Sequence, residues 1–429
     1  MGISSDRPDL DFNAIGDRRI KATLVILFVW AIVSWLHWQP QTQWLMAGLT
    51  AILSVQTVRM LTAKPIFPSI EPDVSLPKVS ILVPAQNESA VLTDLIDNLF
   101  HLNYPTTDLD IWVIDDGSTD ETPQILSKLQ AEFPGLQVRR RESKGGKAGA
   151  LNSVFPLTQG EIVLICDADA QLRADFLRQT VPLFQQKAIG AVQVRKSISN
   201  SNTNFLTRCQ QMEMSCDAFV QTHRLAVAGM TELRGNGMLV RREVLEQFNG
   251  WNEDTVTDDL DLTFKLYLIG TEIEFFTLAA VEEEAVTAWI DLWQQHCRWA
   301  EGGYQRYLDY FPQIFTLDWQ KEIDLLLFLI LQFVLPIALI PDLLWTVFYS
   351  HHPVLWPLQI LFGFLLTVGF LVGVNQFQSL QGWRLIWATI QGSLYMVHWI
   401  PVMIWVTFRM CVQKGRSPWV KTEHYGRSA

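Results

Sequence analysis

The sequence predicts an α/β domain inserted between membrane-spanning helices. Two observations lead to this fold class. Of the 429 residues, 49% are hydrophobic and only 18% are charged, whereas an average soluble domain carries about a quarter of charged residues. The charges are also unevenly distributed, because two long stretches carry almost none and the region between them alternates strand-like and helix-like segments. The net charge of −11 argues against nucleic acid as a partner.

The first charge-poor stretch predicts a helical hairpin in the membrane. No Asp, Glu, Lys or Arg occurs between Ala22 and Val58, and a polar break at residues 39–43 divides the stretch. Each half has about 17 apolar-dominated residues, the short end of the length that spans a bilayer. A cleaved signal peptide is the alternative, but the second apolar run follows without a small-residue cleavage site. We therefore expect a tail at residues 1–21 and a membrane hairpin at residues 22–60.

The second charge-poor stretch predicts a C-terminal membrane region at residues 321–410. Between Leu325 and Phe408 the only charged residues are Asp342 and Arg384. The length of this stretch accommodates about three spanning helices. The predicted segments are 325–348, 354–376 and 385–408.

The positive charges predict that the central domain is cytoplasmic. Lys and Arg residues precede and follow the N-terminal hairpin, whereas its turn has none, so the positive-inside rule places both flanks in the cytoplasm. The other end conflicts with this rule, because three further crossings would place the basic tail at residues 411–429 outside. Gly392 and Pro401 interrupt the last segment, which leaves open that it enters the membrane and returns.

Residues 61–320 provide enough chain for one sizeable domain. Short β-branched runs alternate there with helical patterns, which is typical of βαβ units and a mostly parallel sheet. The five cysteines include no CxxC pair, which argues against a disulfide or a zinc site. The predicted strands are 79–84, 109–114, 161–166 and 191–195, and the predicted helices are 91–102, 122–133 and 260–268.

Two of the predicted strands end in acidic pairs. Asp115 and Asp116 end the second strand, and Asp167 and Asp169 follow the third. Ligands of open α/β sheets bind beyond the carboxyl ends of the strands. An Asp-x-Asp pair there can offer oxygens to a hard divalent cation that also holds phosphate. One such pair alone is better explained by a solvated turn or a helix cap, but two pairs in one sheet favour a binding site.

Three further segments carry candidate functional groups. Lys144–Asn152 (KGGKAGALN) combines glycines with lysines, which allows a close approach to a diphosphate, or it is a flexible basic turn. Thr257–Asp261 (TDDLD) places three Asp at a predicted helix start, either as dipole charges or as a general base. Gln295–Trp299 (QHCRW) precedes the second membrane region and is also compatible with a plain interfacial helix.

Taken together, these motifs resemble the membrane-integrated family 2 glycosyltransferases, which include cellulose, chitin and hyaluronan synthases. Any one motif is weak evidence, but six in the family's order are specific. The resemblance implies a GT-A-type nucleotide-sugar domain, a mostly parallel mixed sheet flanked by helices, that ends in an interfacial helix at about 291–310. The motifs are VPAQNE (83–88), DDGS (115–118), KAGALN (147–152), DAD (167–169), TDD (257–259) and QHCRW (295–299).

The resemblance also implies which residues bind the donor. The acidic end of the second strand matches the contact to uracil, the lysine of KAGALN lies near the diphosphate, and the DxD acids Asp167 and Asp169 hold ribose, diphosphate and a Mg²⁺ or Mn²⁺ ion. The matching donor-binding residues are Pro84, Glu88, Asp115, Asp116, Lys147, Asp167 and Asp169.

For the reaction, the resemblance implies a metal-dependent inverting displacement with Asp259 as general base. The family's Thr-Glu-Asp motif has Glu where this sequence has Asp258, so the role of Asp258 is open. Gln295, Arg298 and Trp299 match the Gln-x-x-Arg-Trp motif. In that motif the Arg assists the diphosphate and the Trp lies at the acceptor end.

Residues 234–237, 250–268 and 281–310 are more narrowly similar to the cyanobacterial β-monoglucosyldiacylglycerol synthases, which move glucose from UDP-glucose to diacylglycerol. This implies an integral protein of a cyanobacterial membrane. A processive β-polysaccharide synthase is the alternative, since Trp419–Thr422 resembles the gating loop of cellulose synthases. A non-catalytic transporter is disfavoured, because the spans contain one acid and no charged pairs. The sequence does not distinguish hexoses or oligomeric states.

Overall fold

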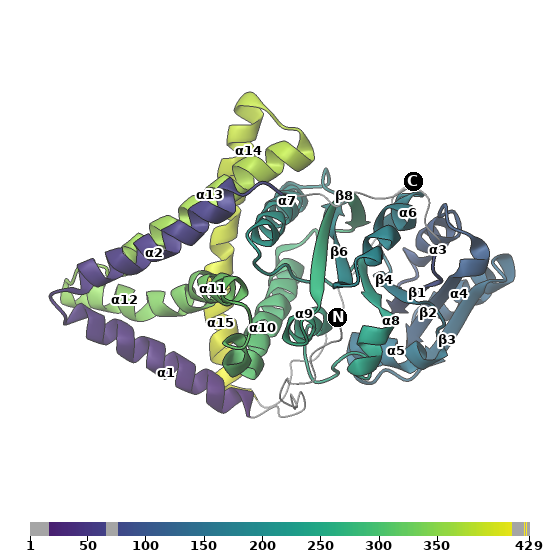
Figure 1. The fold of residues 1–429 in the computed structure, drawn as a ribbon, viewed down its shortest axis with the longest axis horizontal. Helices are drawn as coiled ribbons and strands as arrows, with labels where there is room; N and C mark the ends of the chain where they lie inside the picture. The colour runs from purple at the N-terminus through teal and green to yellow at the C-terminus, as the bar shows by residue number, and fades with distance from the viewer. Residues whose placement is uncertain (1–16, 66–75, 414–423, 425, 427–429) are drawn as a thin grey trace.

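A computed structural model describes residues 17–65, 76–413, 424 and 426. Most of the N-terminal tail and the Trp419–Thr422 segment lie outside these residues. A domain built on a central sheet occupies one side of the molecule, and long helices extend from it on the other side (Figure 1).

The described residues of the domain form a mixed sheet with the strand order β3-β2-β1-β4-β7-β6-β8-β5. The first four strands in this order are parallel, and β7 is antiparallel to both its neighbours. This arrangement confirms the predicted fold class. The strands are β1 (Val79–Ala85), β2 (Leu109–Asp116), β3 (Leu136–Arg141), β4 (Ile162–Ile165), β5 (Gln171–Leu172), β6 (Ile189–Ile198), β7 (Met238–Arg241) and β8 (Glu272–Glu283).

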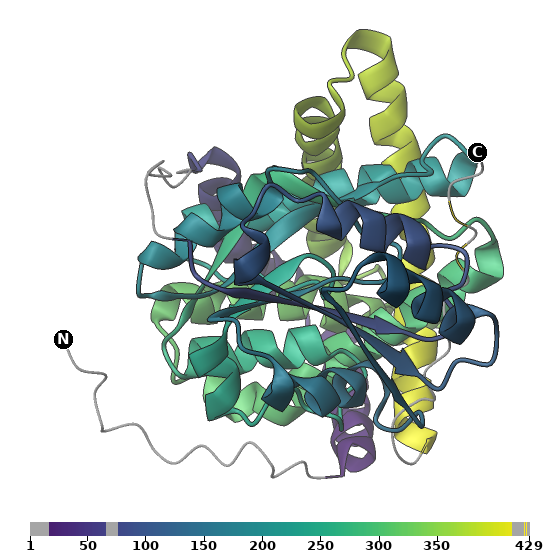
Figure 2. The ribbon, with the colours of Figure 1, turned by 90° about the vertical axis from the view of Figure 1, so that its right-hand side faces the viewer.

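Helices flank the sheet, as Figure 2 shows in a view from the domain side. The strands β1 and β4 are almost entirely buried, because both faces of the sheet are covered at this point. This burial explains why their sequences are continuous apolar runs. Strands β3, β5, β7 and β8 were not predicted. β3 ends in three arginines at the sheet edge, and β5 and β7 have too few residues to show an alternating pattern. The helices are α3 (Leu92–Phe100), α4 (Thr122–Glu132), α5 (Gly146–Val154), α6 (Phe176–Thr180), α7 (Phe205–Ala226), α8 (Arg242–Gln247) and α9 (Asp258–Leu268).

Helix α10 (Trp289–Ile314) connects the domain to the C-terminal helices. Five helical stretches of the described chain are long and apolar enough to cross a membrane, at 18–37, 42–62, 319–349, 356–378 and 382–412. They overlap the five predicted segments. The helices concerned are α1 (Arg18–His37), α2 (Thr42–Thr62), α11 (Trp319–Phe328), α12 (Leu335–Tyr349), α13 (Trp356–Gln378), α14 (Gly382–Tyr395) and α15 (Trp399–Val412), with a π-helical turn between α11 and α12.

The last of these stretches is broken rather than straight. A 3₁₀ turn at Met396–His398 separates α14 from α15. Helices α1, α2, α12 and α13 extend away from the sheet, whereas α15 runs across that direction in both ribbon views (Figures 1 and 2). The broken helix therefore does not follow the direction of the other spans.

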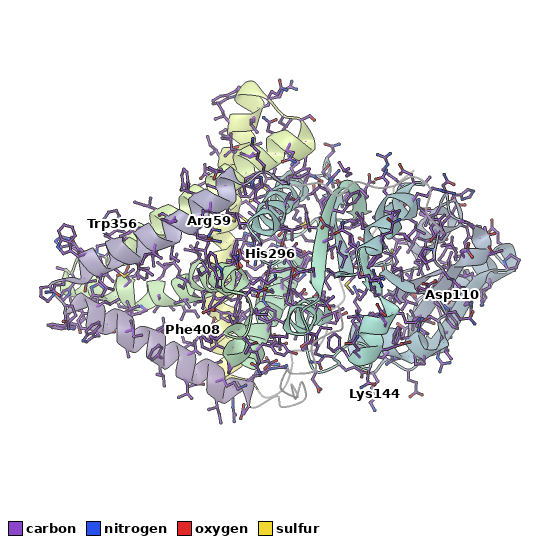
Figure 3. The ribbon with its side chains drawn as sticks, in the orientation of Figure 1. Arg59, Asp110, Lys144, His296, Trp356 and Phe408 are labelled. Carbon is purple, nitrogen blue, oxygen red and sulfur yellow. The ribbon has the colours of Figure 1, made fainter. Side chains whose placement is uncertain are left out.

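Polar contacts from the domain stabilise this break. Glu213 of α7 accepts hydrogen bonds from Tyr395 Oη at 3.0 Å and from Trp399 Nε1 at 2.9 Å. His398 Nε2 lies 2.6 Å from Nδ1 of His296 on α10. His296 is buried between the sheet domain and the long helices (Figure 3). The position of the break thus depends on partners that are distant in the sequence.

A buried ionic cluster joins the domain to the C-terminal helices. Glu232 forms ion pairs with Arg224 at 3.1 Å, Arg234 at 3.1 Å and Arg306 at 3.0 Å. Arg224 also pairs with Asp324 of α11 at 2.8 Å. Burial alone would raise the pKa of Glu232, but the arginines hold it well below its usual range. The cluster links α7, α10, α11 and the loop before β7.

We expect Glu232→Gln to destabilise the protein, because it leaves buried arginine charges without their shared partner. Removing one member of a buried ion pair costs about 3–5 kcal/mol. Glu246 pairs with Arg242 at 3.6 Å and is 57% exposed, so Glu246→Gln is the control, with an expected cost below about 1 kcal/mol. The midpoint of thermal unfolding in detergent measures the difference. Equal midpoints for the two variants would contradict the structural role of Glu232.

Candidate active site

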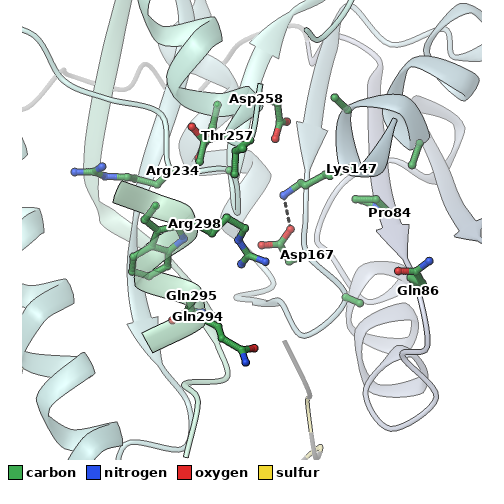
Figure 4. A pocket seen from close by; sticks show the side chains of 18 of the residues that line it. Pro84, Gln86, Lys147, Asp167, Arg234, Thr257, Asp258, Gln294, Gln295 and Arg298 are labelled. Carbon is green, nitrogen blue, oxygen red and sulfur yellow. Dashed lines mark hydrogen bonds and ion pairs between the residues drawn. The ribbon is translucent and has the colours of Figure 1, made fainter. Parts of the chain in front are cut away.

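A cavity of about 340 Å³ lies beyond the carboxyl ends of β1, β2 and β4. Its walls come from these strand ends, from the starts of α5 and α9, and from α10 and α15. In Figure 4, Pro84 and Gln86 lie on one side, Gln295 and Arg298 on the other, and Lys147 and Asp167 between them. The predicted residues in the lining are Pro84, Glu88, Asp116, Lys147, Asp167, Asp169, Asp258, Asp259, Gln295, Arg298 and Trp299.

One predicted donor residue, Asp115, is absent from this lining in the described part of the chain. It is buried, and its Oδ1 atom accepts a hydrogen bond from the amide of Ser118 at 2.9 Å. Successive side chains of a strand point to opposite faces, so only one of two adjacent aspartates faces the cavity. Asp115 thus holds the turn after β2, and its contact to the nucleotide stays a prediction.

Asp116 faces the cavity and is held from behind. Its Oδ2 atom accepts a hydrogen bond from Ser143 Oγ at 3.0 Å, and Arg141 lies 3.0 Å from Oδ1. Burial raises the pKa of Asp116, whereas Ser143 and Arg141 oppose this rise. The carboxylate is thus fixed in orientation at the end of the cavity formed by β1 and β2.

Lys147 supplies a fixed positive charge in the middle of the cavity. Two consecutive glycines, Gly145 and Gly146, have φ values of +78° and +63°, which favour glycine because it has no Cβ, and they turn the chain into α5. Lys147 Nζ lies 2.5 Å from Asp167 Oδ1 (Figure 4). Burial alone would lower the pKa of Lys147, but Asp167 and Asp258 raise it above its ordinary value. The ammonium group therefore stays charged.

Asp167 and Asp169 offer carboxylate oxygens on the same side of the cavity. Burial raises the pKa of Asp169 to about 6, and nearby Glu283 adds to this effect while His424 opposes it. The described residues contain no group of three or more His, Cys, Asp or Glu side chains arranged around one point. Mg²⁺ commonly takes only one or two carboxylates together with substrate phosphates. The donor set therefore fits a divalent ion that binds together with a diphosphate.

Asp258 and Asp259 begin helix α9 and face the same space. Asp259 Oδ1 accepts a hydrogen bond from the amide of Leu260 at 2.8 Å. Asp258 Oδ2 is buried without a hydrogen-bond partner among the described residues. Burial raises the pKa of both carboxyls, and Lys147 opposes this rise. A Cβ atom on Gly235 would lie 3.1 Å from Asp259 Oδ2, so the loop at residues 234–237 (the RGNG loop) approaches this carboxylate closely.

The QHCRW segment lies on α10 and forms the opposite wall. Gln295, Arg298 and Trp299 all line the cavity, because positions three and four residues apart share a helix face. Burial lowers the pKa of Arg298, while Asp167 and Asp259 counteract it. One turn later, a Cβ atom on Gly302 would collide with the Thr257 side chain. Helix α10 can therefore lie directly against the start of α9.

The cavity also contains residues that the sequence did not indicate. Lys196 pairs with Glu283 at 3.0 Å. His424 Nδ1 lies 3.0 Å from Glu88 Oε2, and its Nε2 lies 3.8 Å from Asp169 Oδ2. Lys196 and His424 lie in none of the motifs, whereas Arg234 and Glu283 lie within residues 234–237 and 281–310, the segments of the narrower resemblance. The additional lining residues include Lys196, Arg234, Glu283, Trp405, Arg409 and His424.

The strand-end carboxylates, the lysine and the QHCRW segment of α10 all lie in a region that matches a known protein family. A model described as "Glycosyltransferase like family 2" matches residues 77–302, which include all the predicted site residues. The chain therefore belongs to the family 2 glycosyltransferases.

Relatives that share one name match almost the whole chain. A β-monoglucosyldiacylglycerol synthase from Trichormus variabilis is 46% identical, over 95% of this chain and 90% of that protein. An enzyme of the same name from Synechocystis is 43% identical, over 96% and 90%. Among solved structures, a mannosyltransferase from Pyrobaculum calidifontis, in complex with GDP-Man and Mn²⁺, is 19% identical with a TM-score of 0.61, covering 89% of this chain and 99% of that chain. This likeness shows a shared fold.

The contact between α10 and α9 predicts that Gly302→Ala lowers the rate of glycosyl transfer. The added Cβ would push α10 away from Thr257, and a displacement of about 1 Å can reduce a rate by about 10²-fold. Turnover of purified protein, with UDP affinity measured in parallel, tests this expectation. Gly363 on α13 is the control, because a Cβ there would meet nothing within 4 Å. Equal turnover for Gly302→Ala and Gly363→Ala would contradict the prediction.

Proposed function

We propose that this protein is an inverting glucosyltransferase that transfers glucose from UDP-glucose to 1,2-diacylglycerol. The observation that carries this proposal is one cavity whose lining includes both strand-end carboxylates and helix α15, part of a candidate membrane span. The relatives that match almost the whole chain at 43–46% identity are named for this lipid product. The alternative of a processive polysaccharide synthase has less support, because it would leave that shared name unexplained.

The position of each side chain suggests how the donor binds. Pro84, Glu88 and Asp116 would receive the nucleotide at the end formed by β1 and β2. Lys147 and Arg298 lie nearer the start of α9, where the diphosphate would lie (Figure 4). A divalent Mg²⁺ or Mn²⁺ ion on Asp167 and Asp169 would neutralise diphosphate charge when bound. Fixed cations at a developing negative charge are among the strongest contributions to catalysis.

Asp259 would act as the general base in a single displacement. Its carboxylate takes the proton from the acceptor hydroxyl as that oxygen attacks the anomeric carbon, and the bond from this carbon to UDP breaks. Burial raises the pKa of Asp259, which brings its basicity closer to neutral pH and improves proton transfer. Asp258 would keep Lys147 charged, because its negative charge raises the pKa of that lysine.

Purified protein incubated with radiolabelled UDP-sugars tests the proposal. UDP-glucose and UDP-galactose are compared with and without diacylglycerol, and with Mg²⁺, Mn²⁺ or EDTA, followed by thin-layer chromatography. We expect a chloroform-soluble labelled monoglycosyl lipid only with UDP-glucose, diacylglycerol and metal. Absence of labelled lipid with either metal would refute the lipid acceptor, and an insoluble labelled polymer would support the alternative.

Asp259→Asn should lower the transfer rate by about 10²–10⁴-fold, the usual contribution of a general base. UDP should still bind, because the nucleotide contacts lie on other elements. Asp254→Asn is the control, since Asp254 is exposed and lies in the loop four residues before the start of α9. Transfer assays and UDP titrations measure the two effects. Near-normal turnover of Asp259→Asn would show that another group takes the proton.

The same proposal includes an orientation in the membrane. The catalytic domain would be cytoplasmic, with four crossings by α1, α2, α11–α12 and α13, while α14 and α15 would lie near the membrane surface. Two observations support an even number of crossings. Helix α15 runs across the direction of the other spans (Figure 1), and His424, from the C-terminal tail, lies 3.8 Å from Asp169 in the domain. This orientation also removes the conflict with the basic tail.

A reporter fused to the C-terminus should therefore lie on the same side of the membrane as the catalytic domain. The four-crossing arrangement predicts that a C-terminal green fluorescent protein fusion fluoresces and that an alkaline phosphatase fusion is inactive. Fusions in the α1–α2 turn should behave in the opposite way and serve as the control. An active phosphatase at the C-terminus would indicate an odd number of crossings.

A further inference from the structure

The wall of the cavity that faces away from the nucleotide end includes α15 as well as α10. Trp293 and Trp299 of α10 and Trp405 and Arg409 of α15 line the same cavity as Asp259. Helices α10 and α15 pack against each other, and Arg409 Nη2 donates to Glu301 Oε2 at 2.5 Å. The acceptor end of the site is thus built from two helices, and sequence motifs identify only one of them.

Trp405 lines the cavity and is also 54% exposed at the surface. A side chain with both properties marks the place where the cavity opens. This opening lies on α15, which belongs to an apolar stretch and which the four-crossing arrangement places near the membrane surface. The next aromatic residue along α15, Phe408 (Figure 3), contacts Trp30 of α1 with a ring separation of 5.9 Å. The surroundings of the opening are therefore apolar on the α1 side.

Arg409 provides a polar group just inside the opening. Its side chain is 25% exposed. Its Nε atom is buried and has no hydrogen-bond partner among the described residues. A buried N–H without a partner is costly, and a small rotation of the partly exposed Arg409 side chain would bring this N–H to a ligand oxygen in the cavity. The ester carbonyl of a glycerolipid is a neutral acceptor of this kind.

We propose that Trp405 and Arg409 form the acceptor subsite, through which diacylglycerol enters sideways from the bilayer. The Trp405 indole flanks an acyl chain at the opening, and the Arg409 Nε–H group donates to an ester oxygen. The free hydroxyl then points along α10 toward Asp259. This inference rests on the proposed function and adds the residues that select a two-chain neutral lipid.

The test compares acceptor and donor kinetics in mixed micelles with varied diacylglycerol content. Trp405→Ala should raise the KM for diacylglycerol by about tenfold, in line with the loss of one aromatic anchor, with the KM for UDP-glucose unchanged. Trp387→Ala is the matched control. Trp387 belongs to the same apolar stretch, is 50% exposed and, within the described residues, is not part of the cavity lining.

A second pair of variants separates ligand binding from the ion pair on α10. Glu301→Gln weakens the pair but keeps the Arg409 Nε–H group, whereas Arg409→Ala removes both. We expect a larger increase in the KM for diacylglycerol for Arg409→Ala. Equal increases would overturn the contact between Arg409 and the lipid and indicate a structural role.

A labelling experiment requires no variant, so its outcome does not depend on whether a substituted protein folds. A diazirine analogue of diacylglycerol should label a peptide containing Trp405, and excess diacylglycerol should suppress this labelling. If wild-type protein forms no glycolipid, the proposed function fails. If it forms the lipid while Trp405→Ala behaves like Trp387→Ala, or while the label is found only on other helices, the acceptor subsite is overturned.

Discussion

The structure of the site depends on one buried carboxylate, Glu232, and the three arginines around it. Arg224, Arg234 and Arg306 reach this residue from α7, from the RGNG loop and from α10. The RGNG loop approaches Asp259, and α10 carries the QHCRW motif. Arg224 also binds Asp324 of α11. The same cluster therefore fixes the position of α10 relative to the C-terminal helices. The cluster thereby holds the sheet domain and the apolar helices together around one active site.

The charged groups in the cavity are mostly acidic. Acidic groups lie at the ends of β2 and β4 and at the start of α9, and Lys147 lies among them. The positive charge of Lys147 opposes the rise in pKa of Asp258 and Asp259 that burial causes. A nucleotide diphosphate would add negative charge to a site already rich in carboxylates. This explains why the proposed donor mode requires a divalent cation.

Much of this arrangement follows from local sequence patterns, and the exceptions have physical reasons. The strands β1, β2 and β4 and the helix that begins at Asp258 were predicted from apolar runs and acidic strand ends. The acidic pair at the end of β2 does not by itself show that only Asp116 lines the cavity; the alternation of side chains along the strand accounts for this difference. The break at Met396–His398 depends on Glu213 and His296, more than 90 residues away, and local patterns cannot reveal such contacts. The same holds for Lys196 and His424.

The anomeric configuration of the glycolipid tests the central claim most directly. UDP-glucose carries an α-linked sugar, so one displacement with Asp259 as base must give the β-glycoside. Proton NMR of the purified product distinguishes the two configurations by the coupling of the anomeric proton. A β-linked glucosyl diacylglycerol is the predicted result. An α-linked product would contradict a single displacement and with it the role of Asp259 as the base that activates the acceptor.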